Sequence, residues 1–246
     1  MNRRALLFAT LALLRCWEAA ALLLNKDVLP PPTVVAVTFF RELPGELGKH
    51  FAASFYRVAV SVMVSVALAA PAGLVLGQSK RLNRLFSPFV YLLYPVPKVV
   101  LLPVLLLLLG IGDLPKIAII VLILFFQILV LVRDQAAAIR PELIQSVRSL
   151  GAGRRALFTY VYLPASLPAI LTALRQSVGT AVAVLYVAEL FATRLGLGYY
   201  IYINGSTYFD YPAMYAGVVA MSILGLGMYF TVDWLERRLC RWQYVI

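Results

Sequence analysis

Ionisable side chains that could act on a ligand are rare in this sequence, and several stand alone within long apolar stretches. The candidates are Arg57, Lys98, Arg175 and Glu189. An ionisable residue within an apolar stretch is costly to bury and often marks the path of a substrate or an ion. Three of the four are cationic, so a small anion is the ligand that they favour. The alternatives are structural contacts, long side chains that reach the membrane surface and, for Glu189 near the end of a span, simple hydration.

The residue types that catalysis and metal binding need are almost missing. The chain has one histidine, His50, and two cysteines, Cys16 and Cys240. A zinc site, a disulfide framework and a catalytic serine and histidine pair therefore have no basis in the sequence. We expect no catalytic residue, no bound metal and no cofactor on this chain, and a membrane-embedded enzyme is the weakest of the alternatives.

A polar segment interrupts the apolar sequence at residues 141–164. Pro141 favours a helix start, and Gly151 can end a helix in a left-handed conformation. Between them, apolar residues recur at spacings of three and four, which predicts a short amphipathic helix over 141–150. A second helix is expected from Gly153 towards Leu163, with the chain then broken by Pro164 and Pro168.

Two arginines begin this second helix. Arg154 and Arg155 lie at the positive end of its dipole, which is unfavourable unless an acidic partner or an anionic lipid compensates them. The simpler interpretation of the whole segment is a solvated loop that caps the ends of the neighbouring helices.

The rest of the chain has the composition of a membrane protein. Hydrophobic residues make up 62%, charged residues 13%, and the mean hydropathy is +0.87. Continuous apolar runs without alternation predict helices and an all-α fold of one transmembrane domain. Six spans are expected, near 5–24, 54–77, 87–110, 115–132, 168–190 and 213–235. Pro95, Pro97 and Pro103 should kink or break the third.

Charge sets the expected orientation. The net charge of +11 could indicate nucleic acid, but the basic residues gather in short loops on one side of the spans, as they do in cytoplasmic loops. We therefore expect both termini in the cytoplasm, contact with membrane lipid and no nucleic acid. The first span has an alternative interpretation as a secretory signal, although Arg15 and Glu18 interrupt its apolar run.

The segment 141–164 resembles the signature of permease subunits of binding-protein-dependent ABC importers. That signature reads Glu-Ala-Ala, three residues, Gly, then Phe and Leu-Pro, and here Gly151, Phe158 and Pro164 keep the spacing while Gln145-Ser146-Val147 replaces the opening triplet. The resemblance implies that the segment contacts a partner ATPase. The residues it assigns to this contact are Glu142, Gln145, Ser146, Val147, Arg148, Leu150, Gly151, Ala152, Arg154, Arg155, Phe158 and Pro164.

Further motifs resemble the branch of that family that imports nitrate, sulfonates, taurine and bicarbonate. They include Tyr94-Pro95-Val96-Pro97-Lys98, Leu109-Gly110-Ile111-Gly112 and Gly196-Leu197-Gly198-Tyr199. The resemblance implies the type I importer permease fold in the bacterial cytoplasmic (inner) membrane. It also implies a homodimer with a second permease copy, two cytoplasmic ATP-binding subunits, and a periplasmic or lipid-anchored substrate-binding protein.

Nucleotide binding is assigned to the partner because this chain lacks the phosphate-binding loop. Its nearest glycine-rich stretch, residues 151–155, has no lysine followed by a hydroxyl residue. ATP and Mg²⁺ are therefore expected on the ATPase. A self-contained secondary transporter or channel is the main alternative function.

Overall fold

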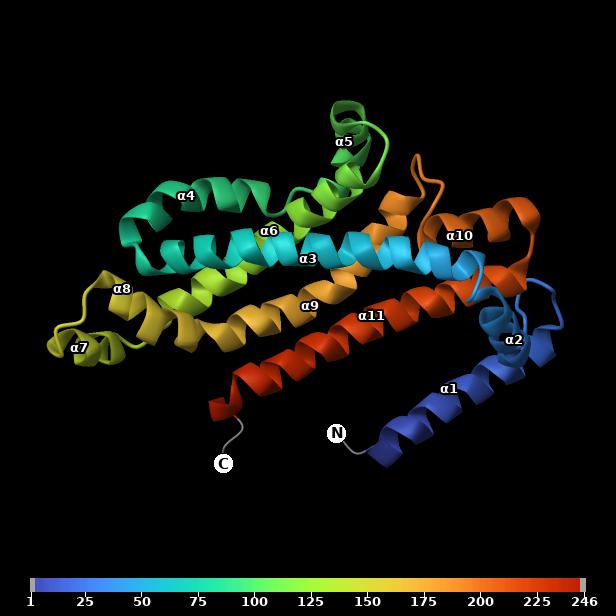
Figure 1. The fold of residues 1–246 in the computed structure, drawn as a ribbon, viewed down its shortest axis with the longest axis horizontal. Helices are drawn as coiled ribbons and strands as arrows, with labels where there is room; N and C mark the ends of the chain where they lie inside the picture. Colours follow the sequence, from blue (N-terminus) through green and yellow to red (C-terminus); the bar gives the residue numbers. More distant parts are fainter. Residues whose placement is uncertain (1–2, 244–246) are drawn as a thin grey trace. The chain divides into compact units, whose positions relative to one another are not determined.

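The computed structural model describes residues 3–243, and these residues form helices joined by short loops, without a strand (Figure 1). The predicted all-α membrane fold is confirmed. The chain forms two compact units. The first consists of the residues up to Phe55 together with Glu189–Leu224, and the second of Tyr56–Ala188 together with the chain from Gly225 onward.

Among the described residues, four helices are long and apolar enough to cross a membrane, and one bent pair of helices would make a fifth span. The four are α3 (Glu46–Gln78), α6 (Asp113–Ala137), α9 (Leu163–Glu189), which continues a helical run from Arg155, and α11 (Tyr211–Leu239). Of these, α3, α6 and α11 each contain a predicted span, and α9 covers the fifth except for its last residue. At 1.5 Å per residue, about 20 residues cover the hydrocarbon core, so these helices extend beyond it. α1 (Arg3–Leu24) lies where the first span was predicted.

The third predicted span is a broken helix. α4 (Lys80–Leu93) and the run Lys98–Leu109 are bent by 79°, and the second part consists of a 3₁₀ turn (Lys98–Leu101) followed by α5 (Leu102–Leu109), as Figure 1 shows. The predicted break at Pro95 and Pro97 is confirmed, since proline cannot donate a helical hydrogen bond. The helix that carries the predicted start of this span, near residue 87, begins before it. The amide of Leu82 donates to the Ser79 hydroxyl at 3.3 Å, which caps α4 seven residues earlier.

The predicted chain break at Pro164 and Pro168 was also wrong. α8 (Arg154–Leu157) passes through a π-helical turn (Phe158–Tyr162) into α9, which continues through Pro168. A π turn shifts the hydrogen-bond register from i→i+4 to i→i+5 and so rearranges the carbonyl groups that face the missing proline N–H. The π turn ends two residues before Pro164 and explains how the helix passes that proline, whereas Pro168 lies within α9 beyond the π turn.

Glycines let α3 approach α6 closely in the second unit. A Cβ atom on Gly73 would lie 2.9 Å from the Leu129 carbonyl oxygen, and one on Gly77 would lie 2.5 Å from the Arg133 carbonyl oxygen. Any larger residue would force the helices apart. The apolar core of this unit includes Leu74, Leu124 and Ile128, all buried.

Short helices complete both units. In the first unit, α2 (Pro32–Glu42) starts at a proline, and α10 (Leu197–Ile203) continues into a π-helical turn (Asn204–Tyr208). The rings of Trp17 on α1 and Tyr215 on α11 lie 5.6 Å apart and help to hold that unit together. In the second unit, α7 (Pro141–Ser149) follows α6, and a 3₁₀ turn (Arg241–Gln243) follows α11.

Candidate functional site

α7 is a short helix whose ends are well defined. Pro141 occupies its first turn with Glu142, and Arg148 lies in its last turn, so the charges oppose the helix dipole favourably. Gly151 follows the helix with φ of +82°, and its amide donates to the Arg148 carbonyl at 2.9 Å. This left-handed glycine confirms the helix end that the sequence predicted.

The surface of α7 is open. None of its nine residues is buried, and the Leu150 side chain just beyond it is 84% exposed. Ile144 and Val147 are half-buried, whereas Gln145, Ser146 and Arg148 face solvent. An exposed leucine beside polar and basic groups on a rigid helix is what a protein contact surface requires.

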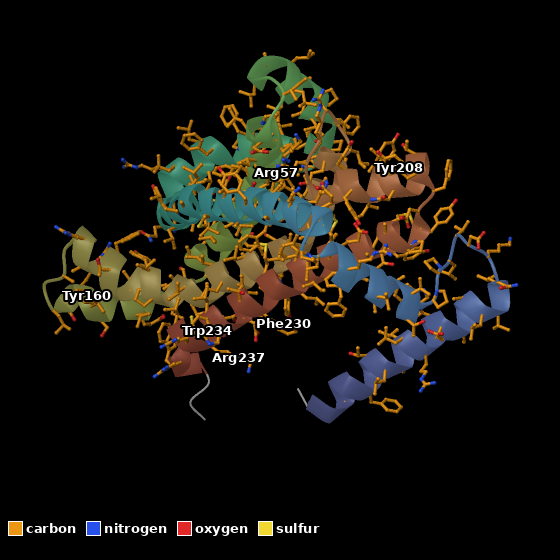
Figure 2. The ribbon with its side chains drawn as sticks, turned by 45° about the vertical axis from the view of Figure 1, so that its right-hand side comes forward. Arg57, Tyr160, Tyr208, Phe230, Trp234 and Arg237 are labelled. Atoms are coloured by element: carbon orange, nitrogen blue, oxygen red, sulfur yellow. The ribbon has the colours of Figure 1, made fainter. Side chains whose placement is uncertain are left out.

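α7 and α8 lie side by side and form the predicted hairpin (Figure 1). Within the second half, Leu157 and Val161 are buried, while Phe158, Ala152 and Pro164 are half-buried and Arg155 is exposed. Tyr160, labelled in Figure 2, is 75% exposed. The side chain of Arg154 lies outside the described residues. The hairpin therefore packs internally through Leu157 and Val161, and it leaves Leu150, Arg148 and Arg155 to solvent.

Arg57 is held by a carboxylate. Its Nε donates to Asp113 Oδ1 at 2.7 Å, and a terminal nitrogen lies 2.7 Å from the same oxygen. The arginine side chain is 5% exposed and that of Asp113 is 50% exposed, so a buried cation meets a carboxylate that keeps contact with water. This pair joins α3 to the start of α6, and Arg57 is labelled in Figure 2.

Lys98 lies at the break between α4 and α5. Its Nζ donates to the carbonyls of Leu93 at 2.8 Å, Tyr94 at 3.0 Å and Val96 at 3.3 Å. It also lies 4.6 Å from the centre of the Phe126 ring. A cavity of about 350 Å³, lined also by Gln127, opens at this position. Carbonyls and an aromatic ring hold the ammonium group without cancelling its charge.

Arg175 on α9 forms ion pairs with α11. Its guanidinium lies 3.1 Å from Asp233 and 3.1 Å from Glu236. Thr172 also donates to Glu236, at 3.3 Å. One arginine thus joins two carboxylates one helical turn apart, an arrangement that locks two helices together.

Glu189 is fully buried in the first unit, so the alternative of hydration was wrong. It accepts hydrogen bonds from the Ser54 hydroxyl at 2.8 and 2.9 Å and from the Gly198 amide at 2.8 Å. The Ser54 oxygen in turn accepts from the Leu197 amide at 2.8 Å. A carboxylate placed against the first amides of α10 neutralises the positive end of that helix.

His50 and Ser54 are polar residues that the sequence reasoning did not connect with Glu189. His50 Nδ1 lies 2.9 Å from both the amide nitrogen and the carbonyl oxygen of Gly196, next to the amides that Ser54 and Glu189 engage. The spacing of four residues between His50 and Ser54 places both on one face of α3, and this was the available signal.

Each of the four candidate residues for a substrate pathway, Arg57, Lys98, Arg175 and Glu189, thus has its own protein partners. Three lie in the second unit and Glu189 lies in the first.

Comparison with known proteins identifies the class. Residues 67–241 match the family described as binding-protein-dependent transport system inner membrane component. A probable ABC transporter permease protein of Brucella abortus (strain 2308) is 35% identical over 219 residues, which cover 88% of this chain and 86% of that protein. The taurine transport system permease protein TauC of Escherichia coli (strain K12) is 30% identical over 236 residues, covering 92% and 85%.

A solved structure supports the fold independently of sequence. A bacterial ABC transporter involved in the import of the acidic polysaccharide alginate superposes with a TM-score of 0.71 at 16% identity, covering 96% of each chain. The chain belongs to the family of binding-protein-dependent ABC importer permeases. Within that family it is similar to the sulfonate and taurine branch, and it is a membrane-embedded permease subunit.

Proposed function

We propose that this chain forms, as a homodimer, the translocation pathway of an ABC importer for a small anion, and that α7 transmits movement from a cytoplasmic ATPase. The observation that carries this proposal is the open surface of α7. Leu150, directly after the helix, is 84% exposed, and Gly151 with φ of +82° then ends the helical path of the chain. A rigid helix seated in a partner moves with it, because packed elements transmit displacement instead of absorbing it.

The contact with the ATPase involves the segment from Glu142 to Pro164. Its central part combines exposed Gln145, Ser146 and Arg148 with apolar Val147 and Leu150. Ala152, Arg155 and Phe158 extend the surface onto the second half of the hairpin, and Arg154 begins α8. ATP and Mg²⁺ belong to the ATPase. Both termini and the hairpin lie on the cytoplasmic side in this scheme, and a periplasmic or lipid-anchored binding protein delivers substrate from the opposite side.

The substrate class follows from the cavity beside Lys98. The Lys98 ammonium group is paired with neutral carbonyls instead of a carboxylate, and it lies next to a cavity of about 350 Å³ that is large enough for an anion of sulfonate size. Gln127 adds an amide to the same cavity. The name of the E. coli relative, a taurine permease, agrees with a sulfonate. Arg57, Arg175 and Glu189 then serve as structural contacts that hold the pathway helices, because each is engaged by neighbouring protein groups.

Reconstitution separates this function from a secondary transporter or channel. The permease is purified from its native host with its ATPase and binding protein, placed in liposomes, and supplied with a radiolabelled sulfonate. We expect uptake that requires ATP and the binding protein together. Uptake by the permease alone, driven by an ion gradient, would instead establish the secondary transporter.

A further inference from the structure

A second cavity, of about 380 Å³, lies within the first unit, where α2 ends and α3, α10 and α11 begin. Its charged lining consists of Glu42, Glu46 and Asp210 against Arg194. Because three carboxylates face one guanidinium, the net negative charge of the lining favours the binding of a cation. None of these residues belongs to the hairpin or to the Lys98 cavity.

Tyr200 adds a fixed polar group to this cavity. Its ring lies 5.3 Å from the His50 ring, and a Cβ on Gly217 would come within 2.8 Å of it, so the ring is held between α3 and α11. Its hydroxyl is buried and makes no hydrogen bond of ordinary geometry with the described residues, although the Glu42 carboxylate lies near it. Burial, followed by the charges of Glu42 and Asp210, raises the pKa of Tyr200 well above its ordinary value. The phenol therefore stays neutral and its oxygen can accept a hydrogen bond.

The carboxylates retain capacity for another cation. Glu42 pairs with Arg41 at 3.3 Å and Glu46 pairs with Lys49 at 2.7 Å, but both basic side chains are about two-thirds exposed. Exposed pairs of this kind contribute little and can rearrange. Asp210 caps α11 through one oxygen, which accepts from the Ala213 amide at 3.0 Å, and it forms no ion pair within the described part of the chain. Its second oxygen is available to a donor.

The size and chemistry of the cavity select the kind of cation. No group of three His, Cys, Asp or Glu side chains among the described residues is arranged to hold a metal ion. A free ammonium ion is about the size of a water molecule, for which roughly 30 Å³ suffices, whereas this cavity is far larger. An ammonium or guanidinium group on an alkyl stem fills it better. Tyr208, labelled in Figure 2, lines the cavity and is 66% exposed, and exposed tyrosines are enriched at protein interfaces.

We propose that this cavity receives a lysine or arginine side chain of the substrate-binding protein and so anchors it to the permease. The inference rests on the proposed function. With both termini in the cytoplasm, the residues that line this cavity follow the first span and lie on the opposite, external side. Asp210 and Glu42 supply charge, the Tyr200 oxygen supplies an acceptor, and the tyrosine rings cover the alkyl stem.

Docking of the binding protein tests this directly. The permease and ATPase complex is placed in lipid nanodiscs, and the binding protein is titrated at low and raised salt. The variants are Asp210→Asn, which can still cap α11, together with Glu42→Gln and Tyr200→Phe, which keep shape. Asp27→Asn, on an exposed loop of the same unit, makes the same charge change away from the cavity and is the control.

We expect Asp210→Asn and Glu42→Gln to weaken docking about tenfold each and to reduce its salt dependence, and Tyr200→Phe to weaken it about threefold. The Asp27→Asn control should match wild type. n-Butylammonium chloride should displace the binding protein more effectively than potassium chloride at the same ionic strength.

Three results would overturn the inference. These are docking within twofold of wild type in all three variants, equal effects of the two salts, or n-butylammonium binding to the cavity with no effect on docking. Failure of the wild-type complex to bind the binding protein would overturn the proposed function as well. If the wild-type complex binds the binding protein and the substitutions do not change this binding, only the inference about the cavity is overturned, and the proposed function stands.

Discussion

The polar groups around Glu189 and those on α7 lie in opposite environments. Glu189 is fully buried and accepts hydrogen bonds from Ser54 and from the Gly198 amide. On α7, no residue is buried, and Leu150 beside it is 84% exposed. The first region has satisfied its polar groups internally, whereas the second leaves a mixed apolar and basic surface in solvent.

This difference shows how burial separates structural polar residues from those available to a partner. A charged residue within an apolar stretch is a candidate for function by sequence alone, but Glu189, Arg57 and Arg175 hold elements together. Lys98 is intermediate, since its partners are neutral and a cavity lies beside it. Much of the hairpin surface has no partner within the described residues, so its exposed polar, basic and apolar side chains are available to another protein.

Removal of the buried Glu189 carboxylate should have the largest effect on the stability of the fold. Glu189→Ala leaves the Ser54 hydroxyl and the Gly198 amide without their acceptor and should lower stability by about 3 kcal/mol, since hydrogen bonds to charged groups contribute about 1.5–3 kcal/mol each. The check is thermal unfolding of the detergent-solubilised protein. Glu18→Ala on α1, outside this network, is the comparison. Equal stability of the two variants would show that the hydrogen bonds of Glu189 do not stabilise the first unit.

Gly151→Val should have the next largest effect. A valine strains the left-handed backbone by about 1–2 kcal/mol, although no atom lies within 4 Å of the added Cβ. We expect uptake by the reconstituted importer to fall about tenfold or more while ATP hydrolysis continues, because the end of α7 is displaced.

Gly151→Asn is the matched control, since asparagine tolerates positive φ. It should restore most of the uptake. Normal uptake in the valine variant would contradict a coupling role for this helix end.

The sequence predicted the four long apolar helices because hydropathy is a local property. The helix α4 begins before the predicted third span, and its first turns are polar because they carry Lys80, Arg81 and Arg84. The sequence reasoning also broke the chain at Pro164 and Pro168, where the helix continues. The end of α7 at Gly151 was predicted correctly, because a glycine that can adopt a left-handed conformation is itself a local signal.

The partners of the charged residues were not predictable in the same way. Arg57 and Asp113 are 56 residues apart, and Ser54 and Glu189 are 135 apart, so only the fold brings them together. One signal was nevertheless available for Arg57. Asp113 is the only carboxylate between residues 79 and 133, and a buried arginine needs one.

A double-mutant cycle on Arg57 and Asp113 should give a smaller effect. Their coupling energy should be about 1 kcal/mol, reduced from that of a fully buried pair because half of Asp113 is in water. Arg57→Gln, Asp113→Asn and the double variant are compared by thermal unfolding. A coupling energy near zero would mean that the pair does not fasten α3 to α6, and Arg57 would return as a candidate pathway residue.

Leu150→Ala should change stability least and thereby sharpen the contrast with Glu189. An 84% exposed side chain has little packing to lose, so unfolding should shift by less than about 0.5 kcal/mol. If Leu150 enters a groove on the ATPase, however, its loss should weaken the assembled complex by about 1.5 kcal/mol, or roughly tenfold in affinity. Titration of the ATPase onto the permease in nanodiscs measures this. Leu107→Ala on α5, where the side chain is 86% exposed, controls for the loss of an exposed leucine and should leave the affinity unchanged. An affinity loss of the same size in both variants would show that α7 presents no specific surface, because exposure alone would then explain the effect.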